Sequence, residues 1–251
     1  AAYLENRSHS WLNYFDPTVG YPRGKSSTGE WRADFNPYNA SRIANEYCEG
    51  NAWQYLWLVP QDLDKLVECF GGVEQTIEKL DGLFTADTKM EGEDVTPDIS
   101  GLIGQYAHGN EPSHHVIYLY NKVRQPWKAQ KYAAQVMHEL YFNAPAGLCG
   151  NEDCGQMSAW YVFSAMGIYP VNPVSGEYEI GTPLFPEMRV NLANRKTFTV
   201  LAPNVSRENI YIQNVKVNGQ PYDKSYITHQ QIMDGATVEF EMGSQPGEIW
   251  Y

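Results

Sequence analysis

The chain has 251 residues, of which 43% are hydrophobic and 19% are charged, and this composition excludes collagen, coiled coils and disordered proteins. Its 30 acidic residues against 18 basic ones give a net charge of −12, which argues against nucleic acid as a partner. No apolar run approaches the roughly 20 residues that span a bilayer, and the first residues lack the pattern of a signal peptide.

Residues 1–171 are expected to be mainly helical, because apolar residues recur at spacings of three and four. The predicted helices cover 45–59, a stretch from Asp62 to Gly71, 75–83, 116–123 and 132–141, with one more after Gly155. Long polar loops separate them. Such loops carry function more often than not in a compact domain.

From residue 172 onward the apolar period changes to two, which is typical of strands. The predicted strands cover 177–180, 188–192, 197–201, 210–217 and 238–242. Asn218-Gly219 is the strongest short hairpin signal in the chain. The sequence therefore predicts two regions, a mainly α region over 1–171 and a small antiparallel β-sheet region over 172–251, which is α+β overall.

The first of three candidate segments surrounds Glu49, which precedes Trp53, Tyr55 and Trp57. A carboxyl group among aromatic rings loses solvation, and this suits a proton donor at neutral pH. The alternative is a carboxylate at a helix start that the helix dipole stabilises.

The second segment is residues 108–115, where three histidines, Asn110 and Glu111 lie within eight residues. The amide and carboxylate oxygens suit a hard cation such as calcium. Adjacent His114 and His115 point to different faces of a helix, so zinc is less favoured than sugar binding, and a plain helix cap stays open.

The third segment is residues 147–161, where glycines bracket Asn151, Glu152 and Asp153 just before a helix. Glycine permits close approach of the backbone, so that these carboxylates can project into a cleft. Asp153 or Glu152 would then accept a proton from water or bind a cation. A glycine-rich turn capped by acids is the structural alternative.

Together these segments closely resemble the calcium-dependent α-mannosidases of glycoside hydrolase family 92. The resemblance rests on residues 49–55, 108–115 and 150–161, and continues through residues 118–121, 125–128, 167–173, 175–178 and 180–185. The matching motifs extend over nearly the whole chain and occur in the same order as in the family.

The resemblance implies part of an (α/α)6 toroid followed by a small β region, which corresponds to the C-terminal portion of the family's chain. The family's N-terminal β-sandwich is expected as a partner, since its aromatic residues help to line the sugar pocket. The resemblance also implies that the protein is secreted, periplasmic or attached to the cell surface.

By the same resemblance, the chain would release terminal α-linked mannose from glycans by single displacement with inversion. Glu49 would be the general acid and Asp153 the general base, with carboxyl groups roughly 6.5–9.5 Å apart. Ca²⁺ would be the cofactor, held by Asn110, Glu111 and Asp153. The implied substrate contacts are Asn51, Trp53, Gln54, His108, Glu111, His114, His115 and Glu152.

Two alternatives from other classes stay open. The chain could be a mannose-binding module that does not cleave its ligand, because aromatic pockets with carboxylates serve both tasks. It could also be a structural fragment that folds only with the N-terminal domain. A Glu49→Gln exchange separates the first alternative from the enzyme, since catalysis collapses while binding persists.

Overall fold

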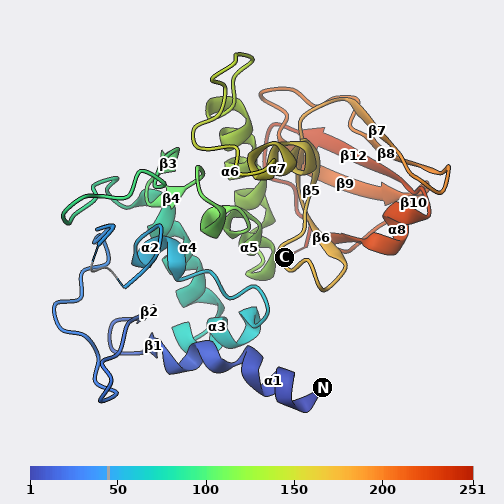
Figure 1. The fold of residues 1–251 in the computed structure, drawn as a ribbon. Helices are drawn as coiled ribbons and strands as arrows, with labels where there is room; N and C mark the ends of the chain where they lie inside the picture. Colours follow the sequence, from blue (N-terminus) through green and yellow to red (C-terminus); the bar gives the residue numbers. More distant parts are fainter. Residues whose placement is uncertain (44–45, 251) are drawn as a thin grey trace. The chain divides into compact units, whose positions relative to one another are not determined.

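The computed structural model describes residues 1–43 and 46–250 (Figure 1). They form two compact units, which are described separately: unit 1 is Ala1–His114 with Cys149–Asn151, and unit 2 is His115–Leu148 with Glu152–Tyr251. The sequence predicts a domain boundary at residue 171, whereas these two units divide after residues 114, 148 and 151. The predicted boundary stays a prediction. Helices and strands both contribute, which confirms the α+β class expected for the whole chain.

Unit 1 consists of short elements joined by long loops. They are α1 (Ala2–Ser8), η1 (Ser10–Asn13), β1 (Phe15–Asp16), β2 (Tyr21–Pro22), α2 (Ala52–Tyr55), α3 (Leu63–Phe70), α4 (Val73–Thr85), β3 (Leu102–Ile103), β4 (Tyr106–Ala107) and η2 (Glu111–Ser113). The predicted helix 45–59 is reduced to α2, and its first residue, Asn45, lies outside the described residues. Leu56 and Trp57 are buried but lie beyond the end of α2. The apolar spacing that predicted a helix there therefore indicates only that these residues are buried.

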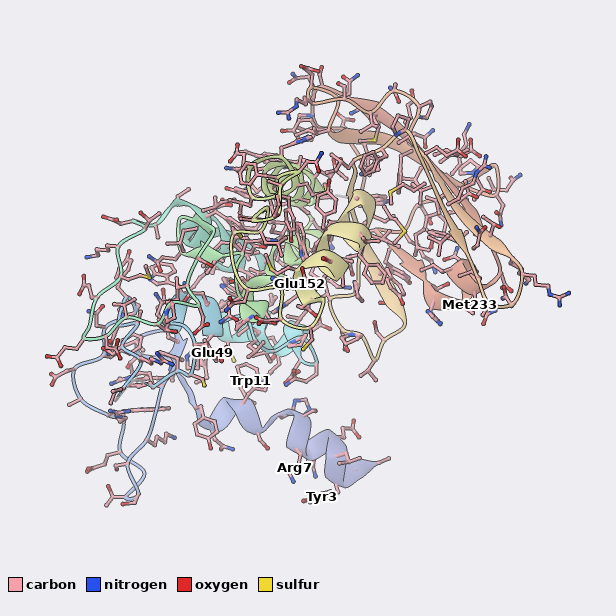
Figure 2. All side chains as sticks on the ribbon, turned by 45° about the horizontal axis from the view of Figure 1, so that its top comes forward. Tyr3, Arg7, Trp11, Glu49, Glu152 and Met233 are labelled. Atoms are coloured by element: carbon pink, nitrogen blue, oxygen red, sulfur yellow. The ribbon has the colours of Figure 1, made fainter. Side chains whose placement is uncertain are left out.

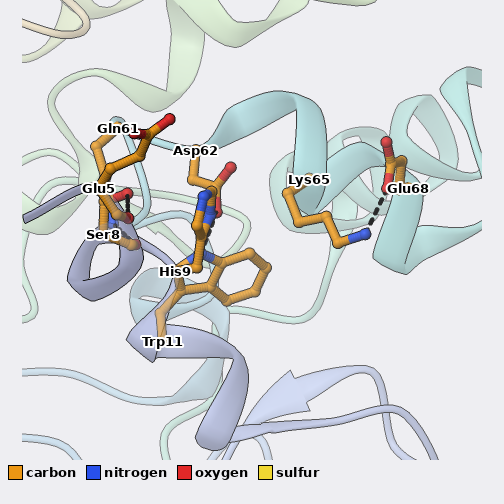
Figure 3. A network of polar contacts seen from close by, with 8 residues as sticks. All are labelled: Glu5, Ser8, His9, Trp11, Gln61, Asp62, Lys65 and Glu68. Carbon is orange, nitrogen blue, oxygen red and sulfur yellow. Dashed lines mark hydrogen bonds and ion pairs between the residues drawn. The ribbon is translucent and has the colours of Figure 1, made fainter. Parts of the chain in front are cut away.

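The predicted start of α3 at Asp62 is confirmed, although the Asp62 side chain does not cap the helix. Its Oδ2 instead accepts from Trp11 Nε1 at 2.8 Å and lies 2.6 Å from His9 Nδ1 (Figure 3). These contacts tie the N-terminal segment to α3. Gly71 ends the helix in the left-handed conformation, with φ of 99°, as its sequence position predicts.

Unit 2 combines helices with two sheets (Figure 1). Its elements are η3 (Val116–Tyr118), α5 (Leu119–Lys122), α6 (Pro126–Glu139), α7 (Gln156–Ala165), β5 (Met166–Tyr169), β6 (Glu177–Pro183), β7 (Glu187–Asn191), β8 (Thr197–Leu201), β9 (Tyr211–Val217), β10 (Gln220–Pro221), β11 (Tyr226–Thr228), α8 (His229–Met233) and β12 (Thr237–Gly243). The five predicted strands are all present, with small shifts at their ends.

The strands form a five-stranded sheet, ordered β10-β9-β12-β8-β7, and a three-stranded sheet, ordered β11-β6-β5. Their inward side chains share one core, which includes Ile168, Ile180, Phe198 and Phe240. The Asn218-Gly219 hairpin is confirmed, because both residues have positive φ and join β9 to β10. The purely antiparallel expectation is wrong at one place, since β12 pairs with β8 in parallel.

Candidate active site

Glu49 lies on the loop that leads into α2 (Figure 2), and its side chain is exposed. Its backbone is held from two sides, because its N–H donates to the Tyr55 hydroxyl at 3.3 Å and its carbonyl accepts from Asn110 Nδ2 at 2.9 Å. The same amide lies 3.4 Å from Glu49 Oε2. The first and second candidate segments therefore meet within unit 1.

The expectation that aromatic rings bury the Glu49 carboxyl is wrong in this structure. Trp53 packs edge-on against Tyr21, with ring centroids 5.7 Å apart, and Trp57 is buried against Phe70 at 5.6 Å. The Trp57 indole fills the interior of unit 1, and the Trp53 indole is half-buried. Proximity in sequence failed as a guide because Trp53 lies within α2 and Trp57 lies beyond its end, while Glu49 lies on the loop before it.

Three buried amides hold the Glu49 loop against the turn between β3 and β4. Asn51 begins α2 with a capping box, in which Asn51 Oδ1 accepts from Trp53 N at 3.0 Å and Gln54 Oε1 accepts from Asn51 N at 2.8 Å. Asn51 Nδ2 donates to Gln105 Oε1 at 2.9 Å, and Gln54 Nε2 donates to the Gln105 carbonyl at 2.6 Å. The sugar contacts expected of Asn51 and Gln54 stay predictions, while the structure gives both amides a scaffolding role.

His108 and His114 lie in the interior of unit 1. His108 has no exposed surface and its Nδ1 is 2.9 Å from the Tyr106 hydroxyl, while His114 Nε2 donates to the His108 carbonyl at 2.9 Å. Burial, together with the neighbouring His114 ring, holds the pKa of His108 well below its ordinary value. His108 is therefore neutral. Their expected contacts with sugar stay predictions, as does that of His115, which is buried in unit 2.

Asn110 and Glu111 provide the oxygen donors that calcium prefers. Asn110 is buried and begins the short helix η2, where its Oδ1 accepts from Glu111 N at 3.2 Å, and Glu111 is half-buried. Within residues 1–43 and 46–250, no three His, Cys, Asp or Glu side chains gather as metal ligands would. The donor chemistry of this pair fits calcium, but most of the six to eight oxygens that calcium takes would have to come from elsewhere.

Close backbone packing brings part of the third segment to the second within unit 1. A Cβ atom on Gly150 would lie 2.6 Å from the Gly109 carbonyl oxygen and 2.7 Å from its Cα. Only glycine permits this approach. Residues 149–151 therefore lie beside Gly109, which directly precedes Asn110.

Glu152 lies in unit 2, at the turn before α7 (Figure 2), and Asp153 follows it in the same turn. Asp153 is exposed, and Asp153, Cys154 and Gly155 have consecutive φ values of 48°, 56° and 95°. Two adjacent non-glycine residues in the left-handed region store strain, which is typical of functional turns. The Glu152 carboxylate accepts from Ser158 N at 3.1 Å and Ser158 Oγ at 2.9 Å, so it caps α7.

Comparisons with known proteins identify the family to which this chain belongs. The family model for the glycosyl hydrolase family 92 catalytic domain matches residues 1–244. The chain belongs to glycosyl hydrolase family 92. The resemblance seen in the sequence is thereby confirmed.

Two solved family 92 structures from Bacteroides thetaiotaomicron are similar to this chain. One is an α-mannosidase in complex with mannoimidazole, 42% identical with a TM-score of 0.88, and 96% of this chain matches 32% of that one. The other is described as an inverting mannosidase, 37% identical with a TM-score of 0.82, and 96% of this chain matches 33% of it.

An uncharacterized secreted glycosidase of Arthroderma benhamiae is 28% identical over 95% of this chain and 32% of its own length. This family 92 chain thus spans about a third of the length of these relatives. No helix in the described residues is long and apolar enough to cross a membrane.

Gln105 is the residue of this family 92 chain that sequence reasoning missed. Besides holding Asn51 and Gln54, its Nε2 donates to the carbonyls of Asp87 at 2.6 Å and Lys89 at 2.8 Å. Its side chain is fully buried. A single glutamine has no periodic signal, and only its place after Gly104, which has φ of 60°, indicates a special turn.

Proposed function

We propose that this chain is the part of an exo-α-mannosidase that carries both catalytic carboxyl groups, and that the enzyme releases terminal mannose from glycans with inversion. Family membership supports a glycosidase, and the similar solved structures are described as α-mannosidases. The observation that carries the proposal is the exposed Glu49 carboxyl on a loop whose backbone is fixed by Tyr55 and Asn110.

In this reaction Glu49 gives its proton to the glycosidic oxygen as the bond to the anomeric carbon breaks. Asp153 takes a proton from the water that attacks the opposite face of the same carbon, so the product is β-mannose. Exposure and the strained backbone at Asp153 support this role.

Calcium belongs to the proposal as the group that binds and polarises the mannose hydroxyls when present. Of the three ligands that the resemblance implies, Glu111 and Asp153 would supply carboxylate oxygens, whereas Asn110 Oδ1 already accepts from Glu111 N. Trp53, half-buried with its indole N–H unpaired, and half-buried Glu111 are the predicted sugar contacts with some exposed surface in unit 1.

The remaining expectations concern the longer protein. We propose that the helices of this chain are part of the (α/α)6 toroid, and that a β-sandwich from the rest of the chain completes the sugar pocket. A secreted, periplasmic or cell-surface location agrees with the relative that is described as secreted.

Exchange of the two carboxyl groups tests the proposal against a mannose-binding module. Glu49→Gln and Asp153→Asn should each lower kcat on an α-mannobiose by at least about 100-fold. Mannobiose affinity, measured by calorimetry, should stay within a few-fold of the original protein. Glu241→Gln is the matched control and should leave kcat unchanged, because Glu241 is an exposed carboxylate on β12 outside the three candidate segments. Hydrolysis that survives either exchange would refute the assignment.

A further inference from the structure

Asn110 contacts Glu49 at two points with one side-chain nitrogen. Its Nδ2 donates to the Glu49 carbonyl at 2.9 Å and lies 3.4 Å from the Oε2 of the same residue. An amide NH₂ group has two hydrogens, one for each acceptor. The pair of contacts therefore fixes the carboxyl group relative to its own backbone.

Asn110 is itself rigidly placed. Its side chain is buried, its Oδ1 accepts from Glu111 N at 3.2 Å, and its carbonyl accepts from Ser113 N at 3.2 Å. Gly109, just before it, is packed against Gly150, at which there is no room for a Cβ atom. A buried donor in a fixed position thus faces an exposed carboxyl group.

We propose that Asn110 is a positioning residue for Glu49, which holds the carboxyl in the orientation that protonates the departing sugar oxygen. This inference rests on the proposed function, in which Glu49 is the acid. An N–H that donates to Oε2 makes that oxygen the acceptor, so the acidic proton sits on Oε1. Asn110 thereby selects which oxygen gives the proton.

This role differs from the calcium ligand that the family resemblance implies for Asn110. A ligand would act through Oδ1, whereas positioning acts through Nδ2. Loss of the ligand weakens calcium binding and affects every substrate. Loss of the positioning contact affects only substrates whose leaving group needs a proton.

Two substrates separate these roles in the Asn110→Ala variant. An α-mannobiose releases an alcohol that needs the proton, while dinitrophenyl α-mannoside releases a phenolate that leaves without it. Asn110→Ala should lower kcat on the mannobiose roughly 100-fold, the cost of about 1 Å of misplacement. It should change KM and the rate on the aryl substrate by less than about threefold. An equal fall on both substrates would overturn the proposal.

The matched control is Asn194→Ala in unit 2. The Asn194 amide also donates to a backbone carbonyl, that of Met233 at 2.7 Å, in an exposed turn. In this control, the ratio of the rate on the mannobiose to the rate on the aryl mannoside should equal that of the unchanged protein. Calcium titration by calorimetry gives a further outcome, because an affinity lost in Asn110→Ala together with equal rate losses would assign Asn110 to the metal instead.

A measurement without substrate separates this inference from the proposed function. The side-chain amide protons of Asn110, followed by NMR, should shift when Glu49 is changed to Ala and stay in place in the Asn194→Ala control. Unmoved signals would overturn the positioning role. Failure of the unchanged protein to cleave either substrate would refute the proposed function, whatever the amide signals report.

Discussion

Replacing Gln105 with methionine is a direct test of the amide network that carries the Glu49 loop. Methionine keeps the approximate volume but removes every side-chain hydrogen bond of Gln105. Asn51 Nδ2 loses its acceptor in a fully buried place, which costs about 1–3 kcal/mol. The carbonyls of Asp87 and Lys89 lose a donor where water has access, at about 0.5–1.5 kcal/mol each.

The expected loss of unfolding free energy is about 2–6 kcal/mol, a large share of the 5–15 kcal/mol that is typical of a domain. Urea unfolding followed by tryptophan fluorescence measures it. Gln61→Met is the matched control, because Gln61 is exposed and donates to the Ser8 carbonyl at 3.2 Å, so its loss should stay below about 1 kcal/mol. A loss below about 1 kcal/mol for Gln105→Met would refute the network's role.

Three further predictions concern other contacts. Gly150→Ala should destabilise unit 1 by roughly 1–3 kcal/mol or more, because the new Cβ has no room. Gly82→Ala inside α4, where the new Cβ meets Trp53 at 3.8 Å, should instead stabilise unit 1 by about 0.5–1 kcal/mol. Equal urea midpoints for the two variants would contradict this. Glu152→Ala should lower the free energy of unfolding by about 1 kcal/mol, because α7 loses its cap, and Glu152→Gln should lower it less. Burial lowers the pKa of His108, so the unfolded chain binds a proton below about pH 6.5 that the folded chain does not. The free energy of unfolding should therefore fall by up to about 1.4 kcal/mol per pH unit as the pH decreases below that value. The slope should be smaller in His108→Gln.

The sheet region was predictable because strands such as β8 and β12 bury alternate side chains. The parallel pairing of these two strands was not, because it depends on contacts between distant parts of the chain. Helix 45–59 was overestimated since Leu56 and Trp57 are buried beyond the end of α2. Apolar spacing reports burial, and burial does not require a helix.

At the site, the three segments were identified from sequence, and two of them meet through Asn110 and Glu49. The solvation of Glu49 was not predictable, because it depends on where the rings of Trp53 and Trp57 pack. Asn51 and Gln54 were assigned to sugar binding from the sequence, although their three-residue spacing is that of a capping box, which the structure contains. Gln105 acts through long-range hydrogen bonds that no local pattern encodes.

The anomer that is released first tests the central claim most directly. Incubation with α-mannobioses in calcium, followed by NMR of the anomeric protons, should give β-mannose before mutarotation, and a chelator should suppress its release. Mannose that appears first as the α-anomer would contradict single displacement between Glu49 and Asp153.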